Sequence, residues 1–329
     1  MFPHGALPLN TPVLEAVSVT KIYPVGGQKL LAVDAVSLHV MRGETLGLVG
    51  ESGCGKSTLG RCLLRLQTVS DGTVRFAGTD ISTMSLRALR PLRPRMQMVF
   101  QDPYGSLNPR RRVGDLVAEP LRVHRDADGN RRSPRAVAAR VGELAELVGL
   151  NPAQMERYPH EFSGGQRQRI GIARALALDP ELVVADEPVS ALDVSVQAQV
   201  INLLMDLQDR LGLTYVFIAH DLTVVRQIAT RVAVMYLGGI VEIGPVSELF
   251  ARPAHPYTAA LLDAVPRLSR VGRAHAPPLR GEVPSPLDLP SGCRFHTRCP
   301  KVESRCRVDR PALRNAGTAH EVACHFPNR

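Results

Sequence analysis

Nine residues, Gly50–Thr58 (GESGCGKST), carry the strongest chemical signal in the chain. They match the pattern G-x-x-x-x-G-K-[ST] and follow the apolar run Leu46–Val49, which predicts a buried strand. In such a loop, glycines let backbone N–H groups turn inward around a polyphosphate, while Lys56 reaches the β- and γ-phosphates and Ser57 holds Mg²⁺. Apolar residues at helical spacing over Leu59–Leu66 predict a helix whose positive end faces the anion. The stretch predicts a nucleotide site.

Polar side chains follow three further predicted strands, two of which are continuous apolar runs typical of a parallel strand buried on both faces. The two apolar runs are Leu182–Ala185, followed by Asp186 and Glu187, and Tyr215–Ala219, followed by His220. The third is the short strand Met96–Phe100, which ends at Gln101. Ligands of open parallel sheets bind beyond the carboxyl ends of the strands, so we expect these side chains to converge on the phosphate loop.

Transfer of a phosphoryl group to water requires a phosphate cradle, a metal ion, a base that orients water and positive charge on the γ-phosphate. We expect Asp186 to act through Mg²⁺ and its waters, and Glu187 to be the general base. We expect His220 to hydrogen-bond the γ-phosphate and the water, and Gln101 to contact Mg²⁺. Taken singly, each residue has an ordinary structural explanation. Coincidence is a poor explanation, however, for three strand ends that meet at one loop.

A second glycine-containing stretch, Phe162–Gln166, opens the predicted helix Arg167–Leu178. Ser163 has the chemistry of a helix N-cap, and Gly164 and Gly165 let a phosphate approach the amides of the first turn. A second anion-binding helix end makes sense if these residues complete the nucleotide site of another subunit. The structural alternative is a capped helix start that contains glycines.

The composition is that of an ordinary globular protein, with 329 residues, 44% of them hydrophobic, and a net charge of +9. We expect no secretion signal and no membrane-spanning segment, because neither a basic, apolar leader nor a run of 18 apolar residues is present. From Ala251 onward there are 13 Arg or Lys against 6 Asp or Glu. Such a basic tail suits nucleic acid, anionic lipid, an acidic partner or simply a solvated surface.

The order of predicted elements indicates an α/β protein. Two β segments, Leu14–Thr20 and Leu30–Val40, flank a Gly26-Gly27 turn, and a later hairpin joins Val232–Tyr236 to Ile240–Ile243 through a Gly238-Gly239 turn. Helical periodicity dominates from Asp102 to about Pro180, as in a helical insert. After Phe250 the chain is rich in Pro and Arg, which predicts a domain boundary there and a linker around Pro266–Pro290.

In their order, these motifs resemble the ATP-binding subunit of an ABC transporter, from Leu14 to about Phe250. The resemblance implies a P-loop NTPase fold of ABC type, with a RecA-like core, an antiparallel β subdomain and a helical insert. It implies a nucleotide-binding domain at 12–250, a helical subdomain at about 102–180, and a small irregular Cys-rich C-terminal domain at 251–329.

The resemblance assigns a role to each motif. Tyr23 is the adenine-stacking aromatic residue, Gln101 the Q-loop glutamine, Glu187 the catalytic glutamate and His220 the switch histidine. The Walker A loop that binds ATP is Gly50, Glu51, Ser52, Gly53, Cys54, Gly55, Lys56, Ser57 and Thr58. The other expected nucleotide and Mg²⁺ contacts are the Walker B residue Asp186, the signature residues Ser163, Gly164, Gly165 and Gln166, and the D-loop residue Asp193.

Three stretches narrow the resemblance to the ATPases of dipeptide and oligopeptide importers, of the DppF/OppF type. They are Gln101–Pro109, His255–Leu262 and the tail from Gly281–Pro286 to Gly292–Phe295. The likeness implies a paralogous ATPase partner in a heterodimer, two membrane-spanning permease subunits that the loop after Gln101 faces, and an extracytoplasmic peptide-binding protein. It implies a peripheral location on the cytoplasmic face of the inner membrane.

Two other functions stay open. An importer ATPase of this kind could serve nickel or another small solute. The other is a soluble ABC-type ATPase acting on nucleic acid; DNA-repair or chromosome ATPases of the SMC type need a long coiled-coil insert, and the 113 positions that separate Gly50 from Ser163 leave no room for one. The importer reading therefore excludes nucleic acid as a partner.

Four of the six cysteines, Cys293, Cys299, Cys306 and Cys324, lie within 32 residues of the tail. Without an export signal a disulfide framework is not expected, whereas four thiolates suit Zn²⁺ or an iron–sulfur cluster. The spacing lacks the C-x₂-C of zinc ribbons, and the resemblance favours a [4Fe–4S] cluster. Free thiols in a reducing cytosol are the alternative.

Overall fold

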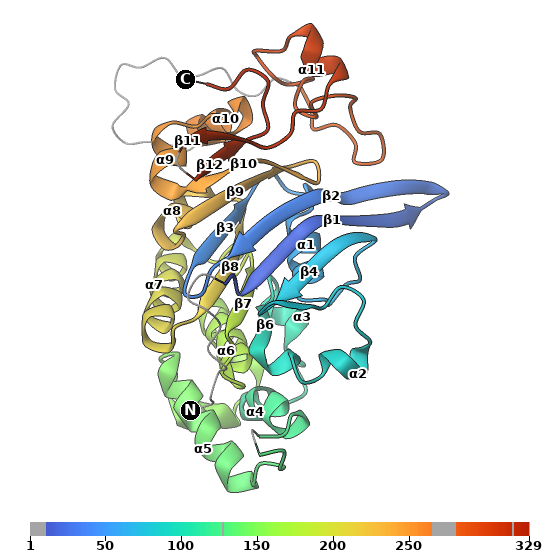
Figure 1. The fold of residues 1–329 in the computed structure, drawn as a ribbon. Coiled ribbons are helices and arrows are strands. Elements are labelled where there is room, and N and C mark those ends of the chain that lie inside the picture. Colours follow the sequence, from blue (N-terminus) through green and yellow to red (C-terminus); the bar gives the residue numbers. More distant parts are fainter. Residues whose placement is uncertain (1–10, 127, 265–280, 318, 329) are drawn as a thin grey trace.

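The computed structural model describes residues 11–126, 128–264, 281–317 and 319–328. Its strands form two sheets, one of four strands in the order β2-β1-β4-β5 and one of eight in the order β11-β12-β10-β9-β3-β8-β7-β6 (Figure 1). The strands are β1 (Leu14–Val25), β2 (Gln28–Val40), β3 (Thr45–Val49), β4 (Asp71–Phe76), β5 (Thr79–Asp80), β6 (Met96–Val99), β7 (Leu182–Asp186), β8 (Thr214–Ala219), β9 (Arg231–Tyr236), β10 (Gly239–Pro245), β11 (Arg314–Gly317) and β12 (His320–Val322). The α-helices are α1 (Lys56–Leu63), α2 (Leu86–Leu89), α3 (Pro103–Ser106), α4 (Val113–Val123), α5 (Pro134–Leu147), α6 (Gly164–Leu176), α7 (Val194–Leu211), α8 (Leu222–Ile228), α9 (Val246–Ala251), α10 (Pro256–Ala264) and α11 (Ser304–Val308).

Four parallel strands, β3, β8, β7 and β6, form one half of the large sheet, with β6 at its edge. The residues of β3, β7 and β8 are buried on both faces, which explains why the sequence there is almost entirely apolar. The register pairs Val49 with Ala219, Ala185 with Phe217 and Val99 with Ala185, so the carboxyl ends of all four strands meet at one edge of the sheet. The phosphate loop leaves β3 at that edge.

The small antiparallel sheet and the large sheet enclose α1. The core between them combines Leu59 and Leu63 of α1 with Val36 and Val74 of the small sheet and Leu48 of the large one. The expected helical stripe ends earlier than predicted: α1 stops at Leu63, because Arg65 adopts a left-handed conformation with φ 51°, and the side chain of Leu66 is 46% exposed.

The hairpin turns require left-handed backbone. Gly26 and Gly27 join β1 to β2 with φ of 55° and 81°, as the sequence predicts. Between β9 and β10 the turn residues are Leu237 and Gly238, with φ of 42° and 84°, rather than the expected Gly238-Gly239. Gly239 is instead the first residue of β10 and pairs with Tyr236.

The predicted helical insert lies at one end of the molecule, where α4 and α5 extend away from the sheets (Figure 1). Helix α5 begins after the N-cap Ser133, with Pro134 in its first turn, and ends before Gly149, which has a φ of 72°. Helix α6 begins at Gly164, three residues before the predicted start. A capping box causes this, since Ser163 Oγ accepts the N–H of Gln166 and Gln166 Oε1 accepts that of Ser163.

The C-terminal residues contain more regular structure than the sequence predicts, since α10, α11, β11 and β12 all follow Phe250. Strand β12 pairs with β10 through Glu242 and Val322, so the tail extends the large sheet. Residues 266–280 of the expected linker lie outside the described residues. Within the ranges that the structure describes, no helix is long and apolar enough to cross a bilayer.

Candidate ATP-binding and hydrolysis site

A cavity of about 380 Å³ opens where the parallel strands end. The residues that line it are Tyr23, Leu30, Leu31, Ala32, Ser52, Gly53, Cys54, Gly55, Lys56, Ser57, Thr58, Gln101, Glu187, Leu237, Gly238 and Pro286. The structure therefore brings most of the phosphate loop together with Tyr23, Gln101 and Glu187, which were expected from separate parts of the sequence.

Two glycines of the loop are required by close backbone contacts. A Cβ atom at Gly50, which has φ 154°, would lie 2.2 Å from the carbonyl oxygen of Met235. A Cβ atom at Gly55, which has φ 103°, would lie 2.1 Å from that of Ala32. The loop thus wraps closely against neighbouring strands, and a side chain at either position would displace it.

The ammonium group of Lys56 is buried inside the loop. Its Nζ donates hydrogen bonds to the carbonyl oxygens of Gly50 at 2.8 Å and Glu51 at 3.0 Å. These neutral acceptors leave its positive charge without a paired anion in the loop. A phosphate oxygen would supply that anion.

The hydroxyl of Ser57 and the carboxylate of Asp186 form the candidate Mg²⁺ site. Ser57 Oγ donates a hydrogen bond of 2.7 Å to Asp186 Oδ1, and Asp186 is 1% exposed. From the residues that the structure describes, Asp186 Oδ2 accepts no hydrogen bond, and it lies 3.8 Å from the nearest nitrogen of Arg61. Burial raises the pKa of Asp186, and the Ser57 and Arg61 contacts only oppose this effect. A buried oxygen that lacks a donor, beside a hydroxyl, fits a hard cation such as Mg²⁺.

Glu187 is held by both neighbouring polar strand ends. Its Oε2 accepts a hydrogen bond of 2.8 Å from Gln101 Nε2 and lies 3.6 Å from His220 Nδ1. Its backbone has φ 45°, which is strained for a residue with a side chain, and is fixed by an N–H bond of 3.0 Å to Ile218 O and by the hydroxyl of Ser190 on its carbonyl. Such strain marks a side chain whose direction is set by its surroundings.

Tyr23 lies at the rim of this cavity. Its hydroxyl hydrogen-bonds the side-chain oxygen of Gln67, and Lys21 Nζ lies 4.9 Å from the centre of its ring. Neither Gln67 nor Lys21 was expected from the sequence. Both contacts fix the position of the ring.

The glycines at the start of α6 have a packing role that the sequence did not reveal. A Cβ at Gly165 would lie 2.4 Å from Val196 Cγ1, and one at Gly164 would lie 3.2 Å from Leu192 Cδ2. They let α6 approach the start of α7, where Asp193 is the N-cap and accepts the N–H of Val196 at 2.9 Å. That hydrogen bond is the main cause that lowers the pKa of Asp193.

The four tail cysteines do not form a metal site in this structure. Within the described residues, no group of three or more His, Cys, Asp or Glu side chains is placed to hold a metal ion. Burial raises the pKa of Cys293 to about 11 and also raises those of Cys299 and Cys324. Burial therefore favours the neutral thiols over the thiolates that bind metal. The expectation of an iron–sulfur centre gains no support from this geometry.

Comparison with protein families places two matches along the chain. A family model described as ABC transporter matches residues 33–190. A second model, described as the C-terminal region of oligopeptide/dipeptide transporters, matches residues 241–306. The first match contains the phosphate loop and Glu187, and the second contains Cys293, Cys299 and Cys306.

Similar proteins and structures agree with these matches. The oligopeptide transport ATP-binding protein AppF of Bacillus subtilis is 51% identical over 95% of this chain and 97% of its own length. A peptide import ATP-binding protein of Brucella abortus is 56% identical over 92% of this chain and 89% of its own length. A dimeric ATP-binding cassette bound to ADP and phosphate has a TM-score of 0.65 and 29% identity over 71% of this chain and 98% of that one. On this evidence the chain belongs to the ATP-hydrolysing, ATP-binding subunits of ABC transporters, in the oligopeptide/dipeptide transporter family.

Proposed function

We propose that the chain hydrolyses MgATP to drive import of dipeptides or oligopeptides through two membrane-spanning permease subunits. The observation that carries the catalytic part is the contact of Glu187 with both Gln101 and His220 beside the phosphate loop. The peptide cargo is supported by relatives named as peptide and oligopeptide transport proteins.

Each catalytic residue has a role that its contacts support. Lys56 exchanges its bonds to the loop carbonyls for phosphate oxygens. Ser57 and Asp186 would hold Mg²⁺, which when bound would supply positive charge beside the phosphates. Glu187 accepts the proton of the attacking water, while Gln101 and His220 hold its carboxylate in place.

We propose that the subunit works in a head-to-tail pair with a paralogous ATPase. Ser163 is exposed at the N-terminus of α6, and within the described residues the stretch 163–166 does not line the cavity of its own phosphate loop. The N–H groups of Gly164 and Gly165 are therefore available to a phosphate bound on a partner subunit, whereas that of Gln166 is capped by Ser163 Oγ. One similar cassette is described as dimeric in a state bound to ADP and phosphate.

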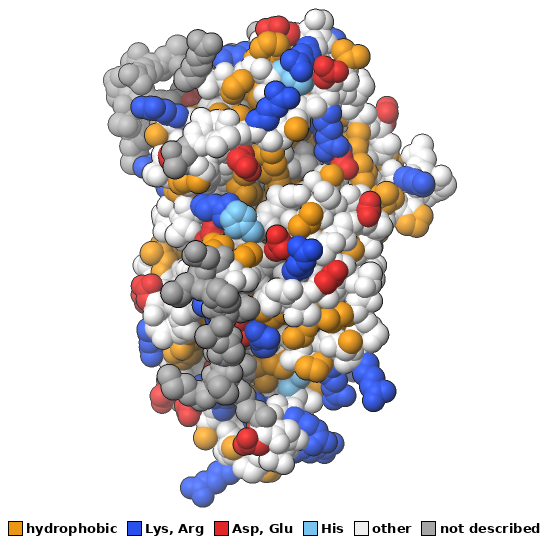
Figure 2. Space-filling view, viewed as in Figure 1, with side chains coloured by type: hydrophobic (Ala, Val, Ile, Leu, Met, Phe, Trp, Pro, Cys, Tyr) orange, Lys and Arg blue, Asp and Glu red, His pale blue; other side chains and the backbone are white. Residues whose placement is uncertain are grey.

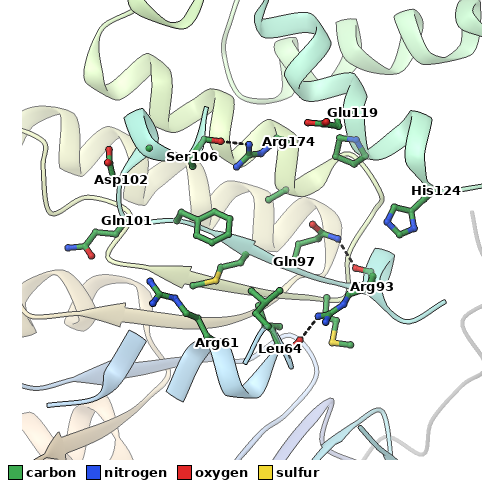
Figure 3. A pocket seen from close by; sticks show the side chains of 17 residues that line it. Arg61, Leu64, Arg93, Gln97, Gln101, Asp102, Ser106, Glu119, His124 and Arg174 are labelled. Atoms are coloured by element: carbon green, nitrogen blue, oxygen red, sulfur yellow. Dashed lines mark hydrogen bonds between the residues drawn. The ribbon is translucent and has the colours of Figure 1, made fainter. Parts of the chain in front are cut away.

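The permease is proposed to dock at a groove of about 770 Å³ next to Gln101. Figure 3 shows Arg61 of α1 and Leu64, the residue after α1, facing Glu119, His124 and Arg174 across β6. Leu66 and Phe100 also line it, and both are large apolar side chains that stay partly exposed. Movement of a permease segment in this groove would be transmitted to Glu187 by the hydrogen bond from the side chain of Gln101.

A charge in the groove is expected to uncouple transport from ATP binding. Leu66→Glu should lower peptide uptake by cells or proteoliposomes at least about tenfold, because burying an unpaired carboxylate at an interface is costly. MgATP binding by the purified variant should stay as in the wild type. The matched control is Leu86→Glu, since Leu86 is 80% exposed and lies outside the groove.

Wild-type uptake by Leu66→Glu would contradict docking at this groove. The same assay tests the cargo, since labelled dipeptide, oligopeptide and nickel can be offered in turn. Uptake of nickel alone would favour the small-solute alternative.

The proposed place of the subunit is the cytoplasmic face of the inner membrane, where the permeases hold it. An extracytoplasmic peptide-binding protein is proposed to deliver the peptide to the permeases.

The charge distribution gives no reason to propose nucleic acid as a partner. On the face shown in Figure 2, Lys and Arg are interspersed with Asp and Glu, and no continuous basic surface is visible on that face. A nucleic-acid surface would gather positive charge along one face or groove.

The [4Fe–4S] cluster is proposed as a feature of the assembled, anaerobically purified protein. A hydrogen bond connects the segments that carry two of the four proposed ligands: the N–H of Cys293 donates to the carbonyl oxygen of Cys306 at 2.8 Å. Charge on Cys299, Cys306 or Cys324 would raise the pKa of Cys293, as expected of neighbouring thiols. A bound cluster would supply the positive charge that lets these buried thiols ionise.

Anaerobic purification is therefore expected to yield iron and acid-labile sulfide in equal amounts. Cys306→Ala should lose both, because it removes one of four thiolate ligands. The control Cys62→Ala, in the buried face of α1, should retain them. A wild-type protein that contains neither iron nor sulfide would leave the tail cysteines as free thiols.

A further inference from the structure

An arginine of the cysteine-containing tail contacts the phosphate loop directly. Arg298 donates from Nη1 to Glu51 Oε2 at 2.7 Å and from Nη2 to Glu51 Oε1 at 3.0 Å. Only 5% of the Arg298 side chain is exposed. Two parallel bonds between a guanidinium and a carboxylate fix direction as well as distance. The tail thus holds the second residue of the loop, although 247 positions separate the two in the sequence.

Glu51 is held at its backbone as well. Its N–H donates to the hydroxyl of Tyr257 in α10 at 3.0 Å, and its carbonyl oxygen accepts from Lys56 Nζ at 3.0 Å. When Lys56 turns to a phosphate oxygen, that last bond is lost. The contacts of Arg298 and Tyr257 then remain to keep Glu51 in place.

Arg298 packs beside a buried cluster of aromatic rings. The rings of Tyr236, Tyr257 and Phe295 are almost fully buried, with centroids 4.7–5.4 Å apart. The guanidinium of Arg298 lies 5.9 Å from the centre of the Tyr236 ring. An arginine fixed by packing and a cation–π contact can impose its position on a flexible partner.

Arg298 also changes the charge that a bound nucleotide meets. The Glu51 carboxylate sits at the start of a loop that binds a polyphosphate, and its negative charge would repel that ligand. Pairing with Arg298 neutralises it. The same contact therefore has an electrostatic effect, which acts on affinity, and a geometric effect, which acts on the rate.

We propose that Arg298 is a positioning residue for ATP hydrolysis, which acts through Glu51 to hold the phosphate loop in its binding conformation. It touches neither phosphate nor water. Its charge can be replaced by that of lysine, but its two-point geometry cannot, because an ammonium group is a single point charge. Substitutions at Arg298 can therefore separate the effect of its charge from the effect of its two-point hydrogen bonding.

The experiment measures steady-state ATPase kinetics and MgATP binding of full-length variants, with thermal unfolding to correct for the folded fraction. Arg298→Gln is expected to weaken MgATP binding several-fold and lower kcat about tenfold, as small misplacement of a catalytic loop does. Arg298→Lys should restore affinity but leave kcat reduced. The double variant Glu51→Gln/Arg298→Gln should bind MgATP more tightly than Arg298→Gln alone, and its kcat should be no lower than that of Arg298→Gln.

Arg310→Gln is the matched control, since Arg310 is a tail arginine that pairs with Asp34 rather than with the loop. It should leave kcat and affinity unchanged. The proposal is overturned if Arg298→Gln matches the wild type per folded molecule, or if kcat losses of the two single variants add in the double variant. An Arg298→Lys variant with wild-type kcat would likewise overturn it. This test does not depend on the iron content of the protein, so the proposal for Arg298 is independent of the proposal for an iron–sulfur cluster.

Discussion

A Glu187→Gln variant is expected to bind MgATP with wild-type affinity and to hydrolyse it at least about 100-fold more slowly, the usual effect of removing a general base. The amide keeps the shape of the carboxylate and can still contact Gln101 and His220, so the strained backbone at φ 45° need not change. It cannot accept the proton of the attacking water. The loss should therefore fall on kcat, with little change in affinity.

Single-turnover hydrolysis and equilibrium binding of a fluorescent ATP analogue would separate the two quantities. Glu321→Gln, at an exposed position of β12, is the control and should behave as the wild type. If the head-to-tail pairing is right, Glu187→Gln with MgATP should also accumulate as an assembled pair in size-exclusion chromatography. A hydrolysis rate within a factor of two or three of the wild-type rate would show that Glu187 is not the general base.

The parts of the site that sequence could predict are those encoded by short patterns. The phosphate loop is nine consecutive residues, Asp186 and His220 each follow a continuous apolar run, and Gln101 follows a short predicted strand. Parallel strands bring their carboxyl ends to one edge, so the meeting of these residues followed from a general rule of sheets. The parallel order of the strands and their register agree with that expectation.

The parts that sequence could not predict depend on contacts between distant segments. The pairing of Arg298 with Glu51 and of Tyr257 with the loop has no local signal, because each partner lies more than 200 positions away. The left-handed backbone of Glu187 is likewise imposed by neighbouring strands, since nothing in its side chain favours it. Arg61 could have been found, because it lies four residues after Ser57 on the same face of α1 and so near Asp186.

Asp186→Asn is expected to abolish measurable Mg²⁺-dependent hydrolysis and, without ligands, to make the protein more stable. The ionised carboxylate is 1% exposed, and Oδ2 accepts no hydrogen bond. Burial of such a group without full compensation costs free energy, which the cation repays when it binds. An amide removes the buried charge and the preferred Mg²⁺ ligand together.

The pKa of Asp186 gives the sign of the pH dependence. Burial raises the folded-state pKa above its unfolded value, so the stabilising contribution of this group is present below the unfolded pKa, where it is protonated. It is lost as pH rises through the folded pKa. At neutral pH the ligand-free wild type therefore lacks this contribution, and the advantage of Asp186→Asn should shrink as the pH falls toward the acidic range.

Thermal unfolding at pH 7.5 in a metal chelator should place the midpoint of Asp186→Asn above that of the wild type by roughly 2 °C, which corresponds to about 1 kcal/mol for a chain of this size. Adding MgATP should raise the wild-type midpoint but not that of the variant, so the order of the two proteins reverses. Ser57→Ala is the informative companion, since it removes the donor to Oδ1 and should lower the ligand-free midpoint. A ligand-free Asp186→Asn protein less stable than the wild type would mean that Arg61 compensates the buried charge, and that Asp186 is a structural ion-pair partner rather than an open metal ligand.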